Sequence, residues 1–372
     1  MGKFRLTRFS PNKLRLRSLK GFLSLFLVGL GLCVSLAACN SPSGGDPAAS
    51  PNGDSASPAQ GGTVNLTLVS YAVTRAAYEQ IIPKFATKWN AEHNQEVVFD
   101  QSYAGSGSQA RAVIDGLDAD IVALALALDT KKIEQAELIQ PGWEKEAPNN
   151  SIVHTSVAAL ITREGNPKGV NGWTDLTRDD IEVITANPKT SGGARWNFMV
   201  LWGAIAQTGG DDTKALEYTT SVYQNVPVLP KDAREATDVF FKQGQGDVLI
   251  NYENEAILAE QKGEGLPFIV PTDVNISIDS PVAIVDANVD KHGTREVAEA
   301  FVEFLFTPEA QEEFAKVGFR PVDPTVGEKY ANEYPKITKL FTVQELGGWD
   351  EVQAKFFDDN AIFDQIQAKV GA

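Results

Sequence analysis

The stretch Asn187-Pro-Lys-Thr-Ser-Gly-Gly-Ala-Arg-Trp-Asn197 carries the clearest structural signal in this chain. Before it, Ile181-Glu-Val-Ile-Thr185 has the short apolar pattern of a strand. After it, the residues from 196 to 207 are mostly apolar and favour a helix. Serine and two glycines between them suit a turn that leads into this helix. A strand, a turn and a helix in this order predict α/β layers.

The same alternation of strands and helices extends along the chain on both sides of this stretch. On the C-terminal side, a helix at 213–223 precedes a strand at 247–250, and Thr307-Pro308-Glu309 has the residues of a helix start. The sequence therefore predicts a mixed α/β fold. On the N-terminal side we predict a βαβαβ unit, with strands at 64–70, 97–99 and 120–124 and helices at 78–89 and 110–117.

Three turns rich in small residues lead into predicted helices. They are Ala104-Gly-Ser-Gly-Ser-Gln109, Thr190-Ser-Gly-Gly-Ala-Arg-Trp196 and Pro230-Lys-Asp-Ala-Arg-Glu-Ala-Thr237. The first turn of a helix has backbone N–H groups without partners and carries the positive end of the helix dipole. It can therefore bind an oxyanion, and glycine lets the ligand approach the backbone closely. Each turn is equally compatible with an ordinary helix cap, so both interpretations stay open.

The N-terminus has the order of a bacterial export signal. Seven basic residues precede an apolar run from Gly21 to Leu36, and Leu36-Ala-Ala-Cys39 resembles the lipobox of bacterial lipoproteins. We therefore predict a lipoprotein signal peptide at 1–38 and a lipid on Cys39, because the apolar run is short for a membrane span. An ordinary signal peptide and an uncleaved membrane anchor are the alternatives.

Residues 39–62 are almost all small or polar, and we expect a disordered tether there. Cys33 lies in the predicted signal peptide and Cys39 carries the lipid, so no disulfide is expected. Removal of the signal peptide leaves 26 basic against 49 acidic residues, a net charge of −23. Such a surface disfavours nucleic acid and anionic membrane surfaces as partners. Any bound anion must therefore be held by local dipoles inside a cleft.

The sequence contains no arrangement of residues that favours an enzyme. His93, His154 and His292 are isolated and lack the spacing of a metal site. Ser106 lacks the glycines, two residues away on each side, that a hydrolase nucleophile elbow needs. There is no phosphate-binding loop and no complete dinucleotide fingerprint. We therefore predict no catalytic residue, no metal and no cofactor, with a secreted lipoprotein hydrolase as the alternative from a different class.

Three segments resemble the signature segments of periplasmic sulfate-binding proteins. They are Tyr103 to Val113, the stretch from Asn187 to Asn197, and Gly246-Asp-Val-Leu-Ile-Asn-Tyr-Glu-Asn-Glu-Ala256. The likeness extends over nearly all of residues 64–323 and is strongest with the cyanobacterial lipoproteins of the sulfate ABC importer. It implies a two-lobed type II periplasmic-binding-protein fold. In that fold each lobe has a mixed sheet flanked by helices, and two crossing strands join the lobes.

The resemblance also implies where the lobes begin and end. The first lobe would contain residues 63–157 and 278–372, the latter with the C-terminal helices. The second lobe would contain residues 158–277. The crossings would fall near 152–163 and 275–285, and the ligand would be enclosed between the lobes.

Seven residues take ligand-binding roles when the family's site is carried over to this chain. At the first of them the enteric members have aspartate, but the contact there is made by the backbone N–H, which alanine keeps. The last, a tyrosine, stands where those members have a tryptophan that donates its indole N–H. A tyrosine hydroxyl can donate as well, and it can also accept. The seven are Ala72, Ser106, Ser191, Gly192, Gly193, Ala233 and Tyr252.

The implied function is capture of sulfate and its delivery to the membrane subunits of an ABC importer. The protein would be a periplasmic monomer that is anchored to the membrane by its lipid alone. Sulfate carries no proton at neutral pH, so we expect backbone N–H groups, two serine hydroxyls and the Tyr252 hydroxyl to suffice as donors. Phosphate brings a proton that needs an acceptor. Thiosulfate, molybdate and phosphate are the alternative ligands.

Three arginines lie beside the predicted helix starts, namely Arg75, Arg195 and Arg234. They either stiffen and steer the site or form ordinary surface ion pairs. The sequence leaves these two interpretations equally open.

Overall fold

The structure, a computed structural model, describes residues 62–371. The predicted signal peptide at 1–38, the predicted lipid site Cys39 and all of the tether except Gly62 lie outside the described residues. Within the described part, no helix is both long and apolar enough to cross a membrane.

The first sheet has six strands in the order β11-β4-β10-β3-β1-β2. β1 pairs in parallel with β2 and β3, whereas β10 pairs antiparallel with β3 and β4. Parallel neighbours need a crossover connection, and helices α1 (Arg75–His93) and α2 (Ser106–Ile114) supply it. This arrangement confirms the predicted βαβαβ unit. The strands are β1 (Thr63–Tyr71), β2 (Glu96–Ala104), β3 (Ile121–Ala123), β4 (Ile152–Ser156), β10 (Ile278–Ile284) and β11 (Arg320–Pro321).

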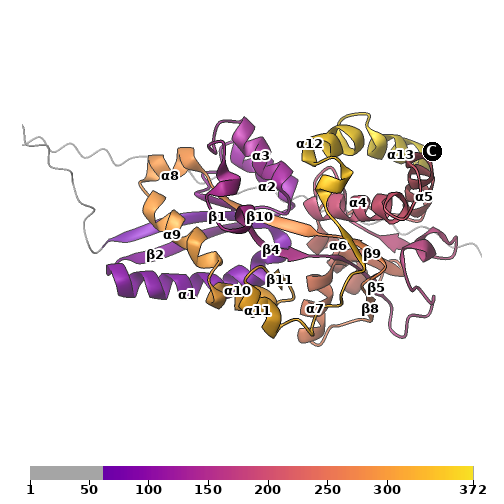
Figure 1. Cartoon of the computed structure of the whole chain (residues 1–372), viewed down its shortest axis with the longest axis horizontal. Coiled ribbons are helices and arrows are strands. Elements are labelled where there is room, and N and C mark those ends of the chain that lie inside the picture. The colour runs from indigo at the N-terminus through magenta and orange to yellow at the C-terminus, as the bar shows by residue number, and fades with distance from the viewer. Residues whose placement is uncertain (1–61, 372) are drawn as a thin grey trace, which may run out of the picture. The chain divides into compact units, whose positions relative to one another are not determined.

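Two layers of helices cover the faces of this sheet. Leu68 and Ile121 belong to one apolar cluster with α1, α9 (Arg295–Leu305) and α10 (Pro308–Lys316). Val69 and Val122, one residue further along, belong to another cluster with α2 and α3 (Ala127–Gln135). Successive side chains of a strand point to opposite faces, so both faces are buried. Figure 1 shows α1 and α10 on one side and α2 and α3 on the other. Two further helices, α8 (Asp286–His292) and α11 (Pro324–Lys329), belong to the part of the molecule that is built on the six-stranded sheet.

The second sheet has four strands in the order β6-β7-β5-β8. β6 and β7 are parallel, and β5 is antiparallel to both β7 and β8. Helix α4 (Gly192–Ala206) follows β6 and is buried almost throughout, in keeping with its mostly apolar sequence. The strands are β5 (Ala158–Thr162), β6 (Val183–Ile184), β7 (Val248–Tyr252) and β8 (Phe268–Ile269), and the other helices are α5 (Asp212–Gln224), α6 (Ala233–Phe241) and α7 (Glu253–Gln261).

The chain passes at single residues between the part built on the six-stranded sheet and the part built on the four-stranded sheet. β4 in the six-stranded sheet and β5 in the four-stranded sheet are separated by Val157 alone. Ser277 alone separates β9 (Val274–Ile276), which lies against α4, from β10 in the six-stranded sheet. Both passages fall within the ranges predicted for the crossings. The exact division of the chain into lobes stays a prediction.

From β12 (Lys339–Phe341) onward, the chain packs against α4 and α5. β12 pairs in parallel with β9, and α13 (Ile362–Val370) lies on α5. Phe341 fits beside Gly203 of α4, where an added Cβ would lie 2.1 Å from the ring carbon Cζ. This close fit between Phe341 and Gly203 helps to hold residues 339–370 against α4. The residue pattern of the segment does not reveal the contact. Between β12 and α13 lies a short helix, α12 (Trp349–Val352), followed by a π-helical turn at Gln353–Phe357.

Several elements differ from their predicted bounds, and β2 (Glu96–Ala104) is six residues longer than the predicted strand at 97–99. Two of the differences have a clear physical reason. α2 begins at Ser106, four residues before the predicted helix at 110–117, because Gly105 is the N-cap in an extended conformation and the Ser-Gly-Ser turn is already helical. β6 has two residues, although we predicted a strand over 181–185. It pairs with β7 alone and lies at the edge of its sheet, so few bonds define its ends.

Candidate functional site

All seven residues that the resemblance predicts for ligand binding line one cavity. The cavity volume open to the centre of a water-sized sphere is about 10 Å³. A single buried water needs roughly this much space. The cavity therefore suits a ligand of a few atoms. Tyr71, Val73, Ala104, Gly105, Ala125 and Asp232 complete the lining.

Several helical segments begin at this cavity. The first N–H groups of a helix have no acceptor within the helix, and the positive end of the helix dipole lies there. The cavity therefore presents backbone donors from separate parts of the chain. α2 begins at Ser106, α4 at Gly192 and α6 at Ala233, and a short turn of 3-10 helix, Ala72–Thr74, leads into α1.

Side-chain caps at α4 and α6 leave the first donors of these helices free. The Ser191 hydroxyl oxygen accepts the Ala194 N–H at 3.2 Å, and Asp232 Oδ1 accepts the Glu235 N–H at 2.8 Å. Both caps bind the N–H three residues later and not the first ones. The turns at 190–196 and 230–237 are therefore helix caps that also point unused N–H groups into a cavity.

Glycines allow the two halves of the cavity to meet. A Cβ added to Gly192 would lie 2.8 Å from the Cβ of Ala125 and 3.0 Å from that of Ser106. A Cβ added to Gly105 would lie 2.6 Å from the Thr190 carbonyl oxygen. Gly105, Ser106 and Ala125 follow strands of the six-stranded sheet, whereas Thr190 and Gly192 follow β6 of the four-stranded sheet. The cavity thus lies between the parts built on the two sheets.

The hydroxyl group of Ser106 is already bonded to the protein. It donates to Asp129 Oδ2 at 2.7 Å and accepts the Ala125 N–H at 3.1 Å. We expected the hydroxyls of Ser106 and Ser191 both to serve as donors for an anion. For Ser106 this expectation is wrong, because the fully buried Asp129 takes its hydrogen. Ser106 offers the cavity the first backbone N–H of α2 instead.

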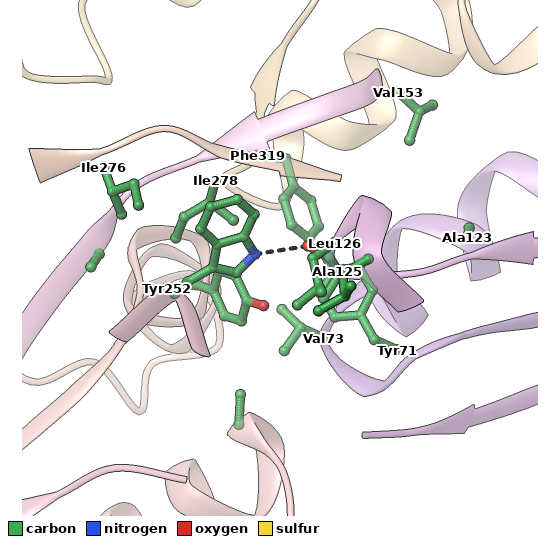
Figure 2. Packing of buried hydrophobic residues seen from close by; sticks show 14 of the residues in the cluster. Tyr71, Val73, Ala123, Ala125, Leu126, Val153, Tyr252, Ile276, Ile278 and Phe319 are labelled. Carbon is green, nitrogen blue, oxygen red and sulfur yellow. Dashed lines mark hydrogen bonds between the residues drawn. The ribbon is translucent and has the colours of Figure 1, made fainter. Parts of the chain in front are cut away.

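Tyr252 ends β7 and places its ring at the cavity. The residue is 2% exposed, and among residues 62–371 its hydroxyl has no hydrogen-bond partner. Burial raises the pKa of this hydroxyl well above its usual value, so it stays protonated and can donate. Its ring lies 5.9 Å from that of Tyr71, and Figure 2 shows both close to Val73. A buried unpaired hydroxyl costs about 1–3 kcal/mol, which a ligand would recover.

Within the described part of the chain, no lysine, arginine or histidine lines the cavity. Its charged side chain is Asp232, whose carboxylate caps α6. None of the three arginines beside the helix starts lines the cavity. Arg195 is buried and is therefore not a surface arginine. Arg195 Nη1 lies 3.5 Å from Asp129 Oδ1, Arg234 Nη2 lies 2.7 Å from Glu255 Oε1, and Arg75 stacks over Tyr103 at 4.6 Å.

This arrangement suits the binding of a small oxyanion. Backbone N–H groups and a protonated hydroxyl meet the oxygen atoms of such a ligand, and each hydrogen bond to a charged group contributes about 1.5–3 kcal/mol. Within residues 62–371, no group of three or more histidine, cysteine, aspartate and glutamate side chains is placed to hold a metal ion.

Residues 66–320 match the family of bacterial extracellular solute-binding proteins. The chain belongs to this family. A sulfate-binding protein of Synechocystis sp. is 58% identical over 91% of this chain and 94% of its own length. A sulfate-binding protein of Synechococcus elongatus is 58% identical over 94% of this chain and 97% of its own length. The solved structure of the sulfate-binding protein SubI from Mycobacterium tuberculosis H37Rv has a TM-score of 0.72 and 36% identity, covering 79% of this chain and 100% of that one.

This solute-binding protein has the two-lobed type II periplasmic-binding-protein fold that we predicted, with a mixed sheet in each lobe. Its family consists of binding proteins that work outside the cytoplasm, which confirms the prediction that it is not an enzyme.

Two buried residues that support the site of this solute-binding protein were not predicted. Asp129 ends an apolar run that begins at Ile121, and Asn251 interrupts the apolar strand β7. A polar residue in such a run is itself a signal, because a buried polar group needs a partner. The sequence does not name the partner. A further contact, from Trp196 Nε1 to the Ala125 carbonyl oxygen at 2.8 Å, joins the lobes beside the cavity.

Proposed function

We propose that this protein captures sulfate in the cavity between its lobes and delivers it to the membrane subunits of an ABC importer. The names of its two cyanobacterial relatives support sulfate as the ligand, because 58% identity extends over more than nine-tenths of the chain. The seven residues carried over from the family all line the same cavity, and this supports their role as ligand contacts.

The observation that carries the proposal is the composition of the cavity lining. Its donors are the backbone N–H groups at the starts of α2, α4 and α6, with the Ser191 and Tyr252 hydroxyls, and no cationic side chain takes part among the described residues. Sulfate has two negative charges and no proton at neutral pH, so it needs donors and no acceptor. Several charge-assisted hydrogen bonds of about 1.5–3 kcal/mol each support tight binding.

Hydrogen phosphate differs from sulfate by one proton, which needs an acceptor. Two carboxylates lie near, but Asp129 is occupied by the Ser106 hydroxyl and Arg195, and Asp232 Oδ1 caps α6. An unmatched buried donor costs about 1–3 kcal/mol. We therefore expect sulfate to bind more tightly than phosphate. Tight phosphate binding would instead assign the second oxygen of Asp232 as the acceptor.

The proposed lobes are residues 63–157 with 278–372 and residues 158–277, and the C-terminal segment from β12 onward, counted with the first lobe, packs against α4 and α5 of the second. The lobes are held together beside the cavity by the Asp129–Arg195 ion pair and by the bond from Trp196 to Ala125. A ligand that contacts both lobes favours the closed arrangement, since its differential affinity shifts the population. In this proposal the importer recognises the closed form.

The lipid anchor is also part of the proposal. It rests on the basic and apolar order of residues 1–38 and on the small residues before Cys39. In this proposal the mature protein is a periplasmic monomer tethered by residues 39–62. Mass spectrometry of the membrane fraction should find an acylated N-terminal cysteine, and a Cys39→Ala variant should not carry the lipid.

The ligand is tested by thermal unfolding of the chain from Asn40 onward, dialysed free of anions, with sulfate, thiosulfate, molybdate, phosphate and chloride added separately. A ligand at a hundred times its Kd adds about 2.7 kcal/mol of stability when only the folded state binds it. The proposal expects an upward shift of Tm with sulfate, and none with chloride. A shift of Tm with another oxyanion but not with sulfate would overturn the assignment of sulfate as the ligand. No shift with any anion would mean that the helix starts are ordinary caps and bind no anion.

A further inference from the structure

Asn251 connects two predicted ligand contacts through one side chain. It lies on β7 directly before Tyr252 and is 1% exposed. Its Nδ2 donates to the Ala233 carbonyl oxygen at 3.0 Å and to Thr237 Oγ1 at 2.9 Å. Its Oδ1 accepts the Tyr252 N–H at 2.8 Å. The first turn of α6 and the last residue of β7 are therefore tied together by a single amide.

The sheet does not require an amide at this position. Asn251 is paired through its backbone with Ala159 of β5, and its neighbours Val248, Leu249 and Ile250 are buried and apolar. A buried amide is costly unless its polar atoms are bonded. Here both its oxygen and its nitrogen are bonded, and the partners lie on two different elements. The bonds of Asn251 therefore hold β7 and α6 in a fixed position relative to each other.

We propose that Asn251 is a positioning residue for anion binding. It does not line the cavity, but it sets the position of the Ala233 N–H relative to the Tyr252 hydroxyl. Hydrogen bonds weaken steeply when distance or angle departs from the best values, and these two donors come from different elements. They can act on one small anion together when their spacing is held by a second layer of bonds. This inference rests on the proposed function.

A second link runs alongside the first. Thr237 Oγ1 donates to Glu255 Oε2 at 2.9 Å, and Arg234 Nη2 donates to Glu255 Oε1 at 2.7 Å. Glu255 belongs to α7, the helix that follows Tyr252, and is 3% exposed. This link joins α6 to α7, and Thr237 Oγ1 also lies 3.1 Å from the Ala233 carbonyl oxygen, but the link does not involve Tyr252. Asn251 bonds both Ala233 and Tyr252, so its loss should misplace both donors at once.

The test is a mutant cycle read out as the Kd for sulfate by titration calorimetry. Asn251→Ala should weaken sulfate binding of the otherwise wild-type protein about 10- to 100-fold, the equivalent of one lost hydrogen bond to a charged group. In a protein that already carries Ala233→Pro and Tyr252→Phe, both donors are absent. There Asn251→Ala should change the Kd less than about twofold, because a positioning residue has nothing left to position.

Asn225→Ala is the matched control. Its Nδ2 likewise donates two hydrogen bonds, here to the carbonyl oxygens of Leu176 and Arg178 at 2.8 and 2.9 Å, and Asn225 does not line the cavity. It should leave the Kd for sulfate unchanged. Equal losses from Asn251→Ala in both backgrounds would overturn the inference and leave the proposed function intact. Failure of the wild type to bind sulfate would overturn both. If the alanine variant does not fold, Asn251→Ser is measured with the same expected outcomes.

Discussion

Gly193 lies so close to Tyr252 that an added Cβ would be 2.7 Å from the ring carbon Cε2 and 2.9 Å from the hydroxyl oxygen. Gly193 belongs to the first turn of α4 and Tyr252 to the end of β7. Separations below 3.0 Å are essentially never seen for real Cβ atoms. The absence of a side chain therefore lets the first N–H groups of a helix and a phenolic hydroxyl face the same small cavity.

Gly193→Ala should weaken sulfate binding by about tenfold or more. The added methyl group must push aside the Tyr252 ring, which also packs against Tyr71, so at least one donor is lost. Titration calorimetry measures the Kd. Gly327→Ala on α11 is the control, since no atom lies within 4 Å of the added Cβ, and its Kd should equal that of the wild type. An unchanged Kd for Gly193→Ala would show that the ring is free to move away.

Tyr252→Phe should have opposite effects on stability and on binding. Without sulfate, the change removes a buried hydroxyl that has no partner among the described residues, so urea unfolding should show equal or greater stability. With sulfate, the loss of one charge-assisted hydrogen bond should raise the Kd about 10- to 100-fold. Lower stability of the anion-free variant would mean that the hydroxyl has a protein partner after all.

Ala233→Pro should delete one backbone donor with little disturbance of the fold. Proline is well tolerated at the first helical position, and Asp232, with φ −151° and ψ 170°, is already extended as the residue before a proline must be. We expect stability in urea within about 1 kcal/mol of the wild type. The Kd for sulfate should rise about 10- to 100-fold. A Kd like that of the wild type would remove Ala233 from the set of contacts.

Arg195→Met should destabilise the protein strongly. Arg195 and Asp129 have side chains 6% and 0% exposed, and removal of one partner of a buried pair costs about 3–5 kcal/mol. Lys132 Nζ, 3.4 Å from Asp129 Oδ1, still pairs with the remaining carboxylate, so we expect a loss at the lower end of this range. The midpoint of urea unfolding measures the loss. Combining Arg195→Met with Asp129→Asn should recover part of it. Arg178→Met is the control, because Arg178 pairs with Asp180 at the surface and should change stability by less than about 1 kcal/mol.

His292 should make stability fall as the pH rises. Its Nδ1 lies 2.8 Å from Asp120 Oδ1 and its Nε2 lies 3.0 Å from Asp118 Oδ2, and these bonds raise the pKa of the imidazole above 6.5. A raised pKa in the folded state means that the stabilisation is complete below pH 6.5 and is lost as pH rises through the folded pKa.

Urea unfolding at a series of pH values from 5.5 to 9 tests this dependence. The wild type should exceed a His292→Gln variant in stability at the acidic end, and the difference should shrink toward the alkaline end. The contrast is His154, whose pKa burial lowers to about 3. The wild type should therefore gain stability relative to a His154→Gln variant as pH rises from 5.5 through 6.5, the opposite direction, and the difference should be constant above that. A difference in stability between the wild type and His292→Gln that does not change with pH would contradict stabilisation by the bonds from His292 to Asp118 and Asp120.

Much of the candidate site could be predicted because helix starts are local features. The serine and glycines at 191–193, the capping Asp232 and the turn before Ser106 are recognisable within a few residues of sequence. The bonding state of the hydroxyls could not be predicted in this way. Ser106 donates to an aspartate 23 residues away, whereas Tyr252 donates to no described residue, and neither fact follows from the neighbours in sequence.

The amino-acid sequence alone determined the alternating strands and helices, the three anion-compatible turns and the acidic composition. The strands, helices and turns depend on propensity and periodicity within a short window, and the charge depends on composition alone. The folded chain was needed to show that the turns face one cavity and that Asn251 bonds Ala233 and Tyr252. It was also needed to place residues 339–370 against α4 and α5. Such contacts depend on side-chain shape and on bonds between residues distant in sequence, which are defined when the sheets and helices pack together.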